Sequence, residues 1–491
     1  MCIMKLWSFF TPYQYIQGDF HMNKKEILNN DNISIDFDKI RKVHFIGIGG
    51  ISMSSLAEIL LSKGISISGS DTNVSALTKH LESLGATINY VQQASNITDD
   101  IDLTVYTAAI DINDPELNAS MEKNIPTIPR ATLLGLIMKS YRHAIGISGT
   151  HGKTSTTSMM SHILLAAETD PTIMVGGILN SINGNLRIGK SETMITEACE
   201  YTNSFLSFFP TVAVILNVAE DHMDFFKDLD EIRLSFKKYA DLVPEHGTVV
   251  IGSDIDNISY FTSDLKCNVI TFGSKESGAD VTATNICYDE SANGSFDLVR
   301  NGQVLTHIDM KVTGLHNIHN ALAAAATALA LDLPVSAIKS GLESFLGTVR
   351  RFEKKGELNG FTIIDDYAHH PDEIKTTLET AKNYPHEKLW CVFQPHTYTR
   401  TKAFFDEFVD TLSLADAVIF ADIYAAREIN TIGISSKDLC DKMIEQGKEA
   451  YYFPSFEEIE KFLLKNCKKG DLLITMGAGN VVNIGDNLLK S

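Results

Sequence analysis

Residues 145–158 read IGISGTHGKTSTTS, and this stretch sets the fold of the middle of the chain. A short apolar run, 144–147, leads into a glycine-containing loop, and the apolar residues that follow Lys153 have helical spacing. A strand, a glycine loop and a helix in this order bind phosphate, because backbone N–H groups and the positive end of the helix dipole attract an anion. We therefore predict that this loop binds ATP or another nucleoside triphosphate.

Lys153 and Thr154 occupy the two positions of the loop that carry its chemistry. The lysine supplies a full charge to the phosphates, and the threonine hydroxyl is the usual Mg²⁺ ligand. The motif is a variant, because the standard spacing places a glycine at position 147, where this chain has isoleucine. A chance Gly-Lys-Thr at a tight turn is the alternative, but the strand and helix on either side favour a phosphate loop. The predicted ATP contacts of the loop are Gly149, Thr150, His151, Gly152, Lys153, Thr154 and Ser155.

The length and composition limit the class of protein. A chain of 491 residues predicts two to four domains, and 44% hydrophobic with 21% charged residues is typical of a soluble globular protein. A net charge of −20 argues against a nucleic-acid partner. Seven cysteines without a C-x-x-C pair indicate neither a zinc site nor a disulfide framework, and no apolar run approaches the length of a membrane span. We expect a cytoplasmic protein without a membrane partner.

Residues 1–38 differ from the rest of the chain. Their first part has an aromatic cluster, a single lysine before position 24 and no proper apolar core, so a signal peptide is not expected. We expect a poorly ordered leader, or an early start codon with Met22 as the true start.

A second glycine loop lies near the start of the chain. A predicted strand, 43–46, runs into GIGGIS at 47–52, which is nearly the dinucleotide fingerprint G-x-G-x-x-G with serine at the third glycine. The next predicted strand ends at Ser70 and Asp71, and an acidic residue about 20 positions after the glycines usually binds a ribose hydroxyl. The pattern favours a nucleotide-type ligand over a purely structural turn. It does not separate NAD from UDP.

Two further strands of the middle region end in acidic residues. The predicted strand 193–196 is followed by Glu200, and the predicted strand 212–216 is followed by an acidic run that contains His222. Ligands of an open parallel sheet bind at the carboxyl ends of its strands, and Mg²⁺ prefers carboxylate oxygens. The pattern therefore favours a magnesium site beside the phosphate loop, with ordinary loop polarity as the alternative.

The middle region continues in two further parts. Residues 248–312 alternate in the manner of strands, with turns predicted at Asn293-Gly294 and Asn301-Gly302. The polar run 314–320, GLHNIHN, then opens an alanine-rich helix over 321–330. This run either caps the helix or contacts a base, and the residues leave both possibilities open.

The last part of the chain predicts a second doubly wound sheet. Three successive apolar strands end in polar runs, and a fourth ends in Gly-Ala-Gly. Polar residues at several neighbouring strand ends are typical of a ligand site in such a sheet. The three runs are DDYAHHP after 361–364, QPHTYTR after 389–393 and DIYAARE after 417–420.

Taken together, these stretches resemble the Mur ligase family of cell-wall synthesis. The resemblance covers roughly residues 41–491 and rests on motifs whose order along one chain is highly specific: HFIGIGGISMS, SGSD, GTHGKT, EACEYTNSFL, EDHMD, HNIHNALAA, RRFE, DDYAHHP and QPHTYTRT. It implies an α/β protein of three domains. These are an N-terminal Rossmann-like UDP-sugar domain at 39–141, a central P-loop ATP domain at 142–346 and a C-terminal Rossmann-like domain for the amino acid and substrate at 347–491.

The resemblance also implies an activity and a set of site residues. The activity is a ligation of L-alanine to the lactyl carboxylate of UDP-N-acetylmuramate, driven by ATP and Mg²⁺, in peptidoglycan precursor synthesis. The nucleotide residues implied are Lys153 at the ATP phosphates, Arg351 at the phosphates or ribose, His316, Asn317 and Asn320 near the adenine, and Gly49, Gly50, Ser70 and Asp71 at the UDP group. The metal ligands implied are Thr154 and Glu200 for one ion and His222 for a second.

The sugar carboxylate and the amino acid are assigned by the resemblance to Tyr367, His369 and Arg400. The groups expected to act in the reaction are Lys153, His222, His369 and Arg400. Three positions depart from the family pattern. Ser52 replaces a glycine often found there, and Cys199 stands where some relatives carry an acid. Thr397 stands where many carry arginine, which leaves carboxylate binding to Arg400.

An amide cannot form directly from a carboxylate, so the acyl group must first be activated. Phosphoryl transfer from ATP gives an acyl phosphate that the amine attacks, and cations must stabilise the moving phosphoryl group. Three alternatives remain: a related ligase that attaches a recycled tripeptide to the same sugar, a nicotinamide-dependent dehydrogenase, and a non-catalytic ATP-gated sensor. The dehydrogenase leaves Gly152-Lys153-Thr154 unexplained.

Overall fold

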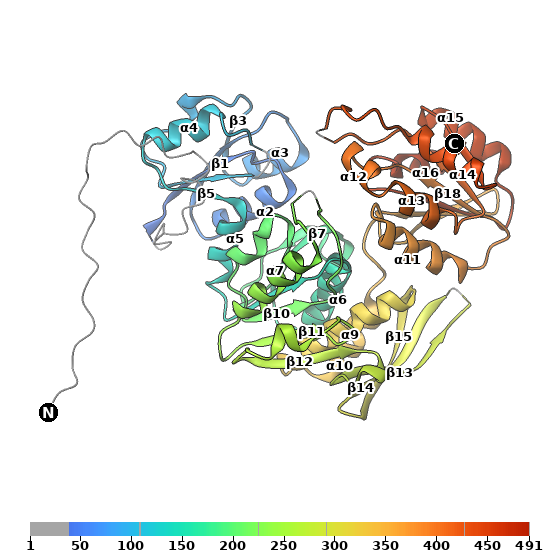
Figure 1. The fold of residues 1–491 in the computed structure, drawn as a ribbon. Coiled ribbons are helices and arrows are strands. Elements are labelled where there is room, and N and C mark those ends of the chain that lie inside the picture. The colour runs from blue at the N-terminus through green and yellow to red at the C-terminus, as the bar shows by residue number, and fades with distance from the viewer. Residues whose placement is uncertain (1–38, 108–109, 224, 291, 427, 491) are drawn as a thin grey trace. The chain divides into compact units, whose positions relative to one another are not determined.

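The computed structural model of the chain describes residues 39–107, 110–223, 225–290, 292–426 and 428–490. The predicted leader, and Asp224 and Arg427 of two strand-end motifs, lie outside these described residues. The chain divides into two compact units, the first comprising residues up to 53 and 60–130, the second residues 54–59 and 131–491. It carries three separate β-sheets with helices between the strands, so the predicted α/β class is confirmed (Figure 1).

The first unit contains a five-stranded parallel sheet in the order β3-β2-β1-β4-β5. The strands predicted from the glycine fingerprint are present with shifts of one or two residues. The strands are β1 (Lys42–Ile46), β2 (Ser66–Ser70), β3 (Thr87–Asn89), β4 (Leu103–Tyr106) and β5 (Thr127–Pro129). The helices are α2 (Ile51–Ser62, whose residues 54–59 belong to the second unit), α3 (Ala76–Ser83) and α4 (Pro115–Glu122).

The second unit begins with a ten-stranded sheet in the order β15-β14-β13-β12-β11-β10-β6-β9-β7-β8. Its middle strands are parallel, and antiparallel strands extend it at both ends. The strands are β6 (His143–Ser148), β7 (Thr172–Leu179), β8 (Gly184–Arg187), β9 (Thr193–Glu197), β10 (Val212–Ile215), β11 (Thr248–Gly252), β12 (Asn268–Gly273), β13 (Val281–Tyr288), β14 (Asn293–Arg300) and β15 (Gln303–Thr313). The helices are α5 (Arg130–Met138), α6 (Lys153–Ala166), α7 (Leu229–Asp241), α8 (Ser259–Thr262), α9 (Leu315–Ala330) and α10 (Val335–Ser344).

Strand β6 shows why the phosphate loop is held firmly. Its alternate residues Ile145 and Ile147 are fully buried in a core that α6, α9 and α10 share (Figure 1). On the other side, a Cβ at Gly146 would lie 2.2 Å from the hydroxyl oxygen of Tyr239, which donates to the Gly146 carbonyl. Gly146, which flanks the variant position of the motif, is therefore required by the packing of Tyr239 and does not contribute to the loop.

One turn prediction in this sheet is wrong. Asn301-Gly302 forms the two-residue connection between β14 and β15, with both residues at positive φ, as predicted. Asn293-Gly294 instead begins β14, where Gly294 pairs with Tyr288. A Cβ at Gly294 would lie 3.0 Å from a methyl carbon of Ile318, so this glycine makes room for α9. The Asn-Gly pair at 293–294 therefore marks a close contact between β14 and helix α9, and not a turn.

The third sheet has the order β16-β17-β21-β18-β19-β20 and is parallel except for β16. The predicted strands in this part of the chain are all present. The strands are β16 (Glu353–Leu358), β17 (Phe361–Asp366), β18 (Leu389–Phe393), β19 (Ala417–Phe420), β20 (Glu449–Tyr452) and β21 (Leu472–Met476). The helices are α11 (Pro371–Lys382), α12 (Tyr398–Ala403), α13 (Phe405–Leu412), α14 (Ser436–Glu445), α15 (Phe456–Asn466) and α16 (Val482–Leu488).

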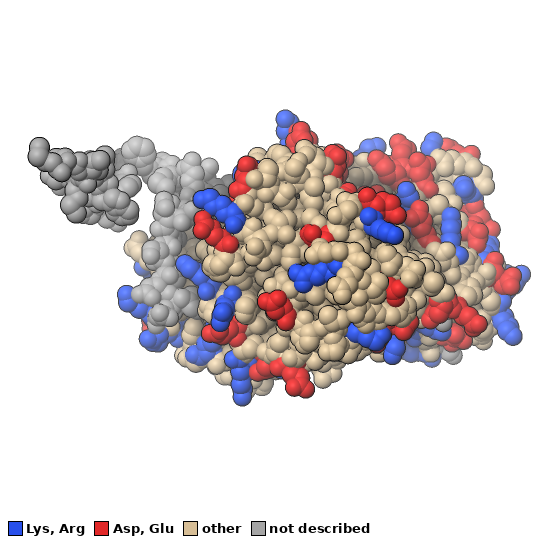
Figure 2. All heavy atoms as spheres, turned by 90° about the horizontal axis from the view of Figure 1, so that it is seen from below, with Lys and Arg blue, Asp and Glu red and all other residues tan. Residues whose placement is uncertain are grey.

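The charged side chains are mixed on the surface. On the described part of the face in Figure 2, Lys and Arg side chains are interspersed with Asp and Glu side chains. Among the described helices, none combines the length and the apolar character needed to cross a lipid bilayer.

Candidate active site

The glycine loop of the first unit is held by the end of β2. Two backbone N–H groups of the loop donate to the Ser70 carbonyl at 2.9 Å, and the Gly49 N–H donates to Asp71 Oδ2 at 2.8 Å. A Cβ at Gly49 would lie 2.7 Å from that oxygen, so only glycine fits. Gly50 directly precedes α2. The four residues predicted at the UDP group are thus brought together, and the Asp71 carboxylate shapes the loop itself.

A buried polar network behind this loop was not predicted from the sequence. Glu116 on α4 accepts a hydrogen bond from the Ser70 hydroxyl at 2.5 Å and lies 3.3 Å from His44 Nε2. All three side chains are fully buried. Because Ser70 belongs to the glycine-loop site, Glu116 fixes that site from within the core.

The phosphate loop joins β6 to α6. Gly152 precedes the helix with φ at 87°, a conformation that glycine adopts without strain. A Cβ there would lie 2.5 Å from Asn320 Oδ1, so α9 also approaches the loop closely at this point. Lys153 Nζ donates to the carbonyl of Gly149 at 2.5 Å and to that of Thr150 at 3.0 Å. The lysine therefore folds over the loop, and its charge lies inside it.

The end of β10 fixes the other side of the phosphate loop. The Asn217 side chain accepts a hydrogen bond from the His151 N–H at 2.8 Å and donates to the His151 carbonyl at 3.0 Å. The Thr150 hydroxyl accepts from the Ala219 N–H at 2.9 Å. These bonds fix the conformation of the loop against the end of β10. Asn217 was not among the predicted site residues, because its double hydrogen bond depends on the approach of two distant loops.

Acidic and imidazole groups from β9 and β10 meet beside Lys153, as the strand order predicts. Glu200 Oε2 lies 3.0 Å from Lys153 Nζ, and only 3% of the Glu200 side chain is exposed. His222 Nε2 lies 3.9 Å from Glu200 Oε1 and 3.8 Å from Asp221 Oδ2. Burial acts to lower the pKa of Lys153, but the negative charge of Glu200 outweighs it and raises that pKa. Lys153 is therefore charged at neutral pH.

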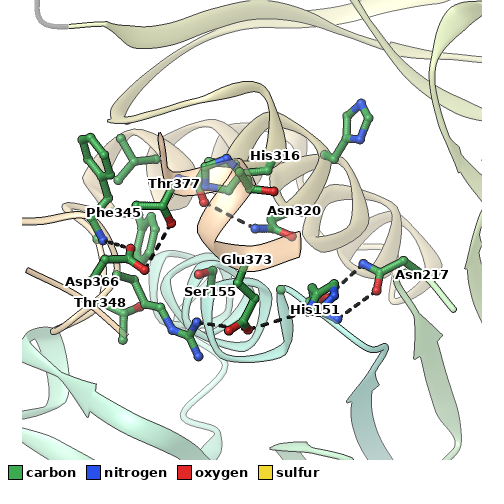
Figure 3. A pocket seen from close by; sticks show the side chains of 18 residues that line it. His151, Ser155, Asn217, His316, Asn320, Phe345, Thr348, Asp366, Glu373 and Thr377 are labelled. Carbon is green, nitrogen blue, oxygen red and sulfur yellow. Dashed lines mark hydrogen bonds and ion pairs between the residues drawn. The ribbon is translucent and has the colours of Figure 1, made fainter. Parts of the chain in front are cut away.

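A cavity of about 270 Å³ opens beside the phosphate loop (Figure 3). It is lined by loops and helices that surround the ten-stranded sheet and by residues of β17 and α11 in the last part of the chain. Predicted nucleotide residues gather around it: His151, Ser155, His316, Asn317, Asn320 and Arg351. Burial lowers the pKa of His316 to about 4, so its ring is neutral at neutral pH. A neutral imidazole and two amides are suited to hydrogen bonding with a purine base.

A larger cavity of about 820 Å³ lies where the β10 loop approaches the strand ends of the third sheet. Arg400 and His222 both line it, and Arg400 Nη2 lies 3.8 Å from Asp221 Oδ1. Burial acts to raise the pKa of Asp221, but His222, His370 and Arg400 outweigh it and lower that pKa. An ionised aspartate thus holds the arginine in the cavity wall.

Of the two other residues assigned to the sugar carboxylate and the amino acid, His369 lies close to this cavity, and the Tyr367 ring centroid is 5.4 Å from that of His369. The His369 ring centroid is 5.8 Å from that of His396, which lines the cavity. Tyr367 packs under the guanidinium groups of Arg350 and Arg351, at 4.9 and 5.2 Å from its ring centroid. Tyr367 therefore supports arginine side chains in this structure.

Two acidic residues of the smaller cavity were not among the predicted site residues. Asp366 ends β17 and accepts hydrogen bonds from the Phe352 and Ala368 N–H groups, and burial raises its pKa to about 6. Glu373 on α11 forms ion pairs with both His151 and Arg351, and Figure 3 shows it beside His151. The sequence carried one signal for Glu373, since an acid in the first turn of a helix can accept a hydrogen bond from the backbone that precedes the helix, here the His369 N–H.

Comparison with known proteins identifies the family. Three family models match the chain: Mur ligase family, catalytic domain, at 42–142; Mur ligase middle domain at 147–328; and Mur ligase, glutamate ligase domain, at 350–479. The chain is 58% identical over 456 residues to a UDP-N-acetylmuramate–L-alanine ligase from Lachnospira eligens, covering 93% of this chain and 99% of that protein. The chain belongs to the Mur ligase family.

Two further relatives extend this comparison. The Mur ligase described here is 56% identical to a UDP-N-acetylmuramate–L-alanine ligase from Agathobacter rectalis, over 93% of this chain and 99% of that one. It resembles the crystal structure of a UDP-N-acetylmuramate–alanine ligase from Thermotoga maritima with a TM-score of 0.76 and 29% identity, over 91% of this chain and 98% of that chain. The family resemblance predicted from the motifs is confirmed.

The metal ligands implied for this Mur ligase suit a hard cation. Glu200 contributes a carboxylate that already lies against a positive charge, 3.0 Å from Lys153 Nζ. His222 Nε2 is 3.9 Å from the same carboxylate, and Thr154 is the second residue of the adjoining helix α6. An oxygen-rich group of few protein ligands beside a phosphate loop fits Mg²⁺, which keeps several waters and phosphate oxygens in its shell.

Proposed function

We propose that this Mur ligase is an ATP-dependent, ADP-forming enzyme that joins L-alanine to the lactyl carboxylate of UDP-N-acetylmuramate in peptidoglycan precursor synthesis. The observation that carries this proposal is the ion pair between Lys153 of the phosphate loop and the buried Glu200. The neighbouring His222 lines a cavity that Arg400 also lines. Such a loop suits a nucleoside triphosphate, and an arginine suits a carboxylate. The names and high identity of the relatives support the choice of substrates.

We assign one ligand to each of the three parts of the chain. Residues 39–141 bind the UDP-sugar. The support is the glycine loop, in which the Gly49 N–H donates to Asp71 and a Cβ at Gly49 would lie too close to that carboxylate. Residues 142–346 take ATP, supported by the phosphate loop and by the cavity next to it. Residues 347–491 take the amino acid, supported by Arg400 in the larger cavity.

The assigned residues have different roles in the reaction. Lys153 places a positive charge where the phosphoryl group moves, and the Glu200 carboxylate keeps that lysine charged. Arg400, held by Asp221, binds and orients a carboxylate. His369, at the end of the neighbouring strand and next to His396, contacts the same carboxylate. Thr154, Glu200 and His222 would hold Mg²⁺, which neutralises phosphate charge when bound.

The activity itself is tested by phosphate release from ATP. We expect release only when UDP-N-acetylmuramate and L-alanine are both present, and little release with either alone. Replacing L-alanine by serine, glycine or the peptidoglycan tripeptide compares the amino substrates in the same assay. Phosphate release that does not depend on either co-substrate would favour an ATP-gated sensor. Faster phosphate release with the tripeptide than with L-alanine would favour the recycling ligase. An absorbance change with NAD would favour a dehydrogenase.

The metal assignment makes a separate prediction. Glu200→Ala and His222→Ala should each raise the Mg²⁺ concentration for half activity by about ten-fold or more, because removing a group that holds or orients a metal commonly costs this much affinity. Excess metal or Mn²⁺ should partly rescue both variants. Glu220→Ala is the matched control, since this exposed acid lies in the same loop. An unchanged metal dependence in both variants would place Glu200 and His222 outside the metal shell.

A further inference from the structure

Glu373 is an acidic side chain enclosed by basic and imidazole groups. It lies in the first turn of α11, and 16% of its side chain is exposed. Its Oε1 lies 3.6 Å from His151 Nδ1 and 3.8 Å from Arg351 Nη1. Its Oε2 accepts a hydrogen bond from the His369 N–H at 3.2 Å and lies 3.4 Å from His369 Nδ1. Figure 3 shows the Glu373 carboxylate directed toward His151, to which a dashed line joins it.

The partners of Glu373 belong to two different substrate sites of the proposed function. His151 is part of the phosphate loop, and Arg351 lines the same cavity, so both lie where ATP phosphates are expected. His369 is assigned to the sugar carboxylate. The two oxygens of Glu373 thus divide between the sites, with Oε1 toward the nucleotide and Oε2 toward the acceptor.

Glu373 carries a negative charge at neutral pH. Burial acts to raise its pKa, but His369, His151 and Arg351 outweigh burial and hold the pKa well below its usual range. The ATP phosphates are also negative and need the same cations. Like charges brought together in a partly desolvated site repel each other, and such juxtapositions are strongly unfavourable for binding.

We propose that Glu373 is an internal anion that competes with the ATP phosphates for Arg351 and His151 while it orients His369 for the acceptor carboxylate. Glu373 is a positioning residue in this scheme, because it acts through the three side chains that it contacts. It weakens the binding of ATP through Arg351 and His151 and favours binding of the acceptor through His369. This inference rests on the proposed function, and it concerns how tightly ATP and the acceptor bind.

The binding test uses the full chain with the non-hydrolysable ATP analogue adenylyl imidodiphosphate and Mg²⁺, without sugar or alanine. Glu373→Gln removes the charge and keeps the size, so we expect about ten-fold tighter binding by calorimetry. Glu373→Asp keeps the charge but withdraws it by one methylene, so its affinity should lie between those of Glu373→Gln and the native protein. Glu379→Gln, an exposed acid on the same helix, is the control and should bind like the native protein.

The kinetic test separates positioning from a merely structural role. For Glu373→Gln we expect KM for ATP to fall and KM for UDP-N-acetylmuramate to rise, because the competing anion and the anchor of His369 are lost together. A variant that was only partly folded would lower the maximal rate and leave both KM values unchanged. Glu373→Asp should show the same split with smaller size, so either variant suffices if the other does not fold.

This design distinguishes a failure of the proposed function from a failure of the role of Glu373 alone. A native protein that does not bind the Mg²⁺–nucleotide at all would overturn the proposed function. A native protein that binds it, with Glu373→Gln or Glu373→Asp binding no more tightly, would overturn the role of Glu373 alone. Two KM values that rise together would do the same.

Discussion

Replacing Lys153 by alanine is expected to lower the turnover of this Mur ligase by about 100-fold or more, since preorganised charge on a developing anion is usually the largest single contribution to such catalysis. The lysine nitrogen lies inside the phosphate loop, 3.0 Å from the Thr150 carbonyl oxygen and 3.0 Å from Glu200 Oε2. Four oxygen contacts fix this charge inside the loop, and alanine removes it. Steady-state phosphate release with saturating substrates measures the loss.

The same substitution should also lower stability, because Lys153 and Glu200 form a largely buried ion pair. Removing one partner of such a pair typically costs about 3–5 kcal/mol, and the 16% exposure of the lysine side chain places the loss at the lower end of that range. Unfolding in urea measures this loss as a lower midpoint with an unchanged slope.

A double variant separates the two effects. Lys153→Met with Glu200→Gln keeps the shapes of both side chains and removes both charges, so it should recover most of the stability and none of the activity. Near-native turnover in any folded variant that lacks the Lys153 amine would contradict the assignment of the phosphate loop.

Much of the fold was predictable because its parallel strands are short, buried and apolar. Ile145 and Ile147 are fully buried in β6, and such runs end where the chain turns to loops of glycine and polar residues. Parallel strands present these loops at one edge of the sheet, which is why Lys153, Glu200 and His222 could be expected to meet. The strand order β10-β6-β9 brings exactly these three loops next to one another.

The parts that could not be predicted depend on contacts between distant residues. Gly294 reads as a turn residue, but its function is to accommodate Ile318 of a helix that begins twenty-one residues later, at Leu315. Asp71 reads as a ribose ligand, while its carboxylate accepts hydrogen bonds from the Gly49 and Asn73 N–H groups. In both cases the residue type was a correct signal, and the partner that gives it meaning lies elsewhere in the chain.

Glu373 illustrates the same limit within the site. Strand-end reasoning finds residues in loops, and Glu373 lies inside helix α11. Its significance comes from His151, more than two hundred residues earlier in the sequence, which approaches it only in the folded protein. Residues that connect two sites are therefore harder to predict than residues that form one.

The route of the reaction makes the final prediction, which concerns the fate of a single oxygen atom. If the lactyl carboxylate attacks the γ-phosphorus of ATP, the bond to ADP breaks and the carboxylate oxygen becomes part of an acyl phosphate. The alanine amine then attacks the carbonyl carbon, and that oxygen leaves with the phosphate. With both carboxylate oxygens labelled by ¹⁸O, each molecule of released phosphate should therefore contain one ¹⁸O, with ADP as the other product.

The arrangement of charged groups favours this route over an acyl-adenylate. Lys153 and the Glu200–His222 group lie at the phosphate loop, where a helix N-terminus and a cation suit a moving γ-phosphoryl group. Arg400 lies in the adjoining cavity, 3.8 Å from Asp221 Oδ1, and can hold the acceptor in line without entering the phosphate chemistry. Mass spectrometry of the phosphate decides the matter: unlabelled phosphate, or AMP with pyrophosphate, would rule out the acyl phosphate and the division of roles between Lys153 and Arg400.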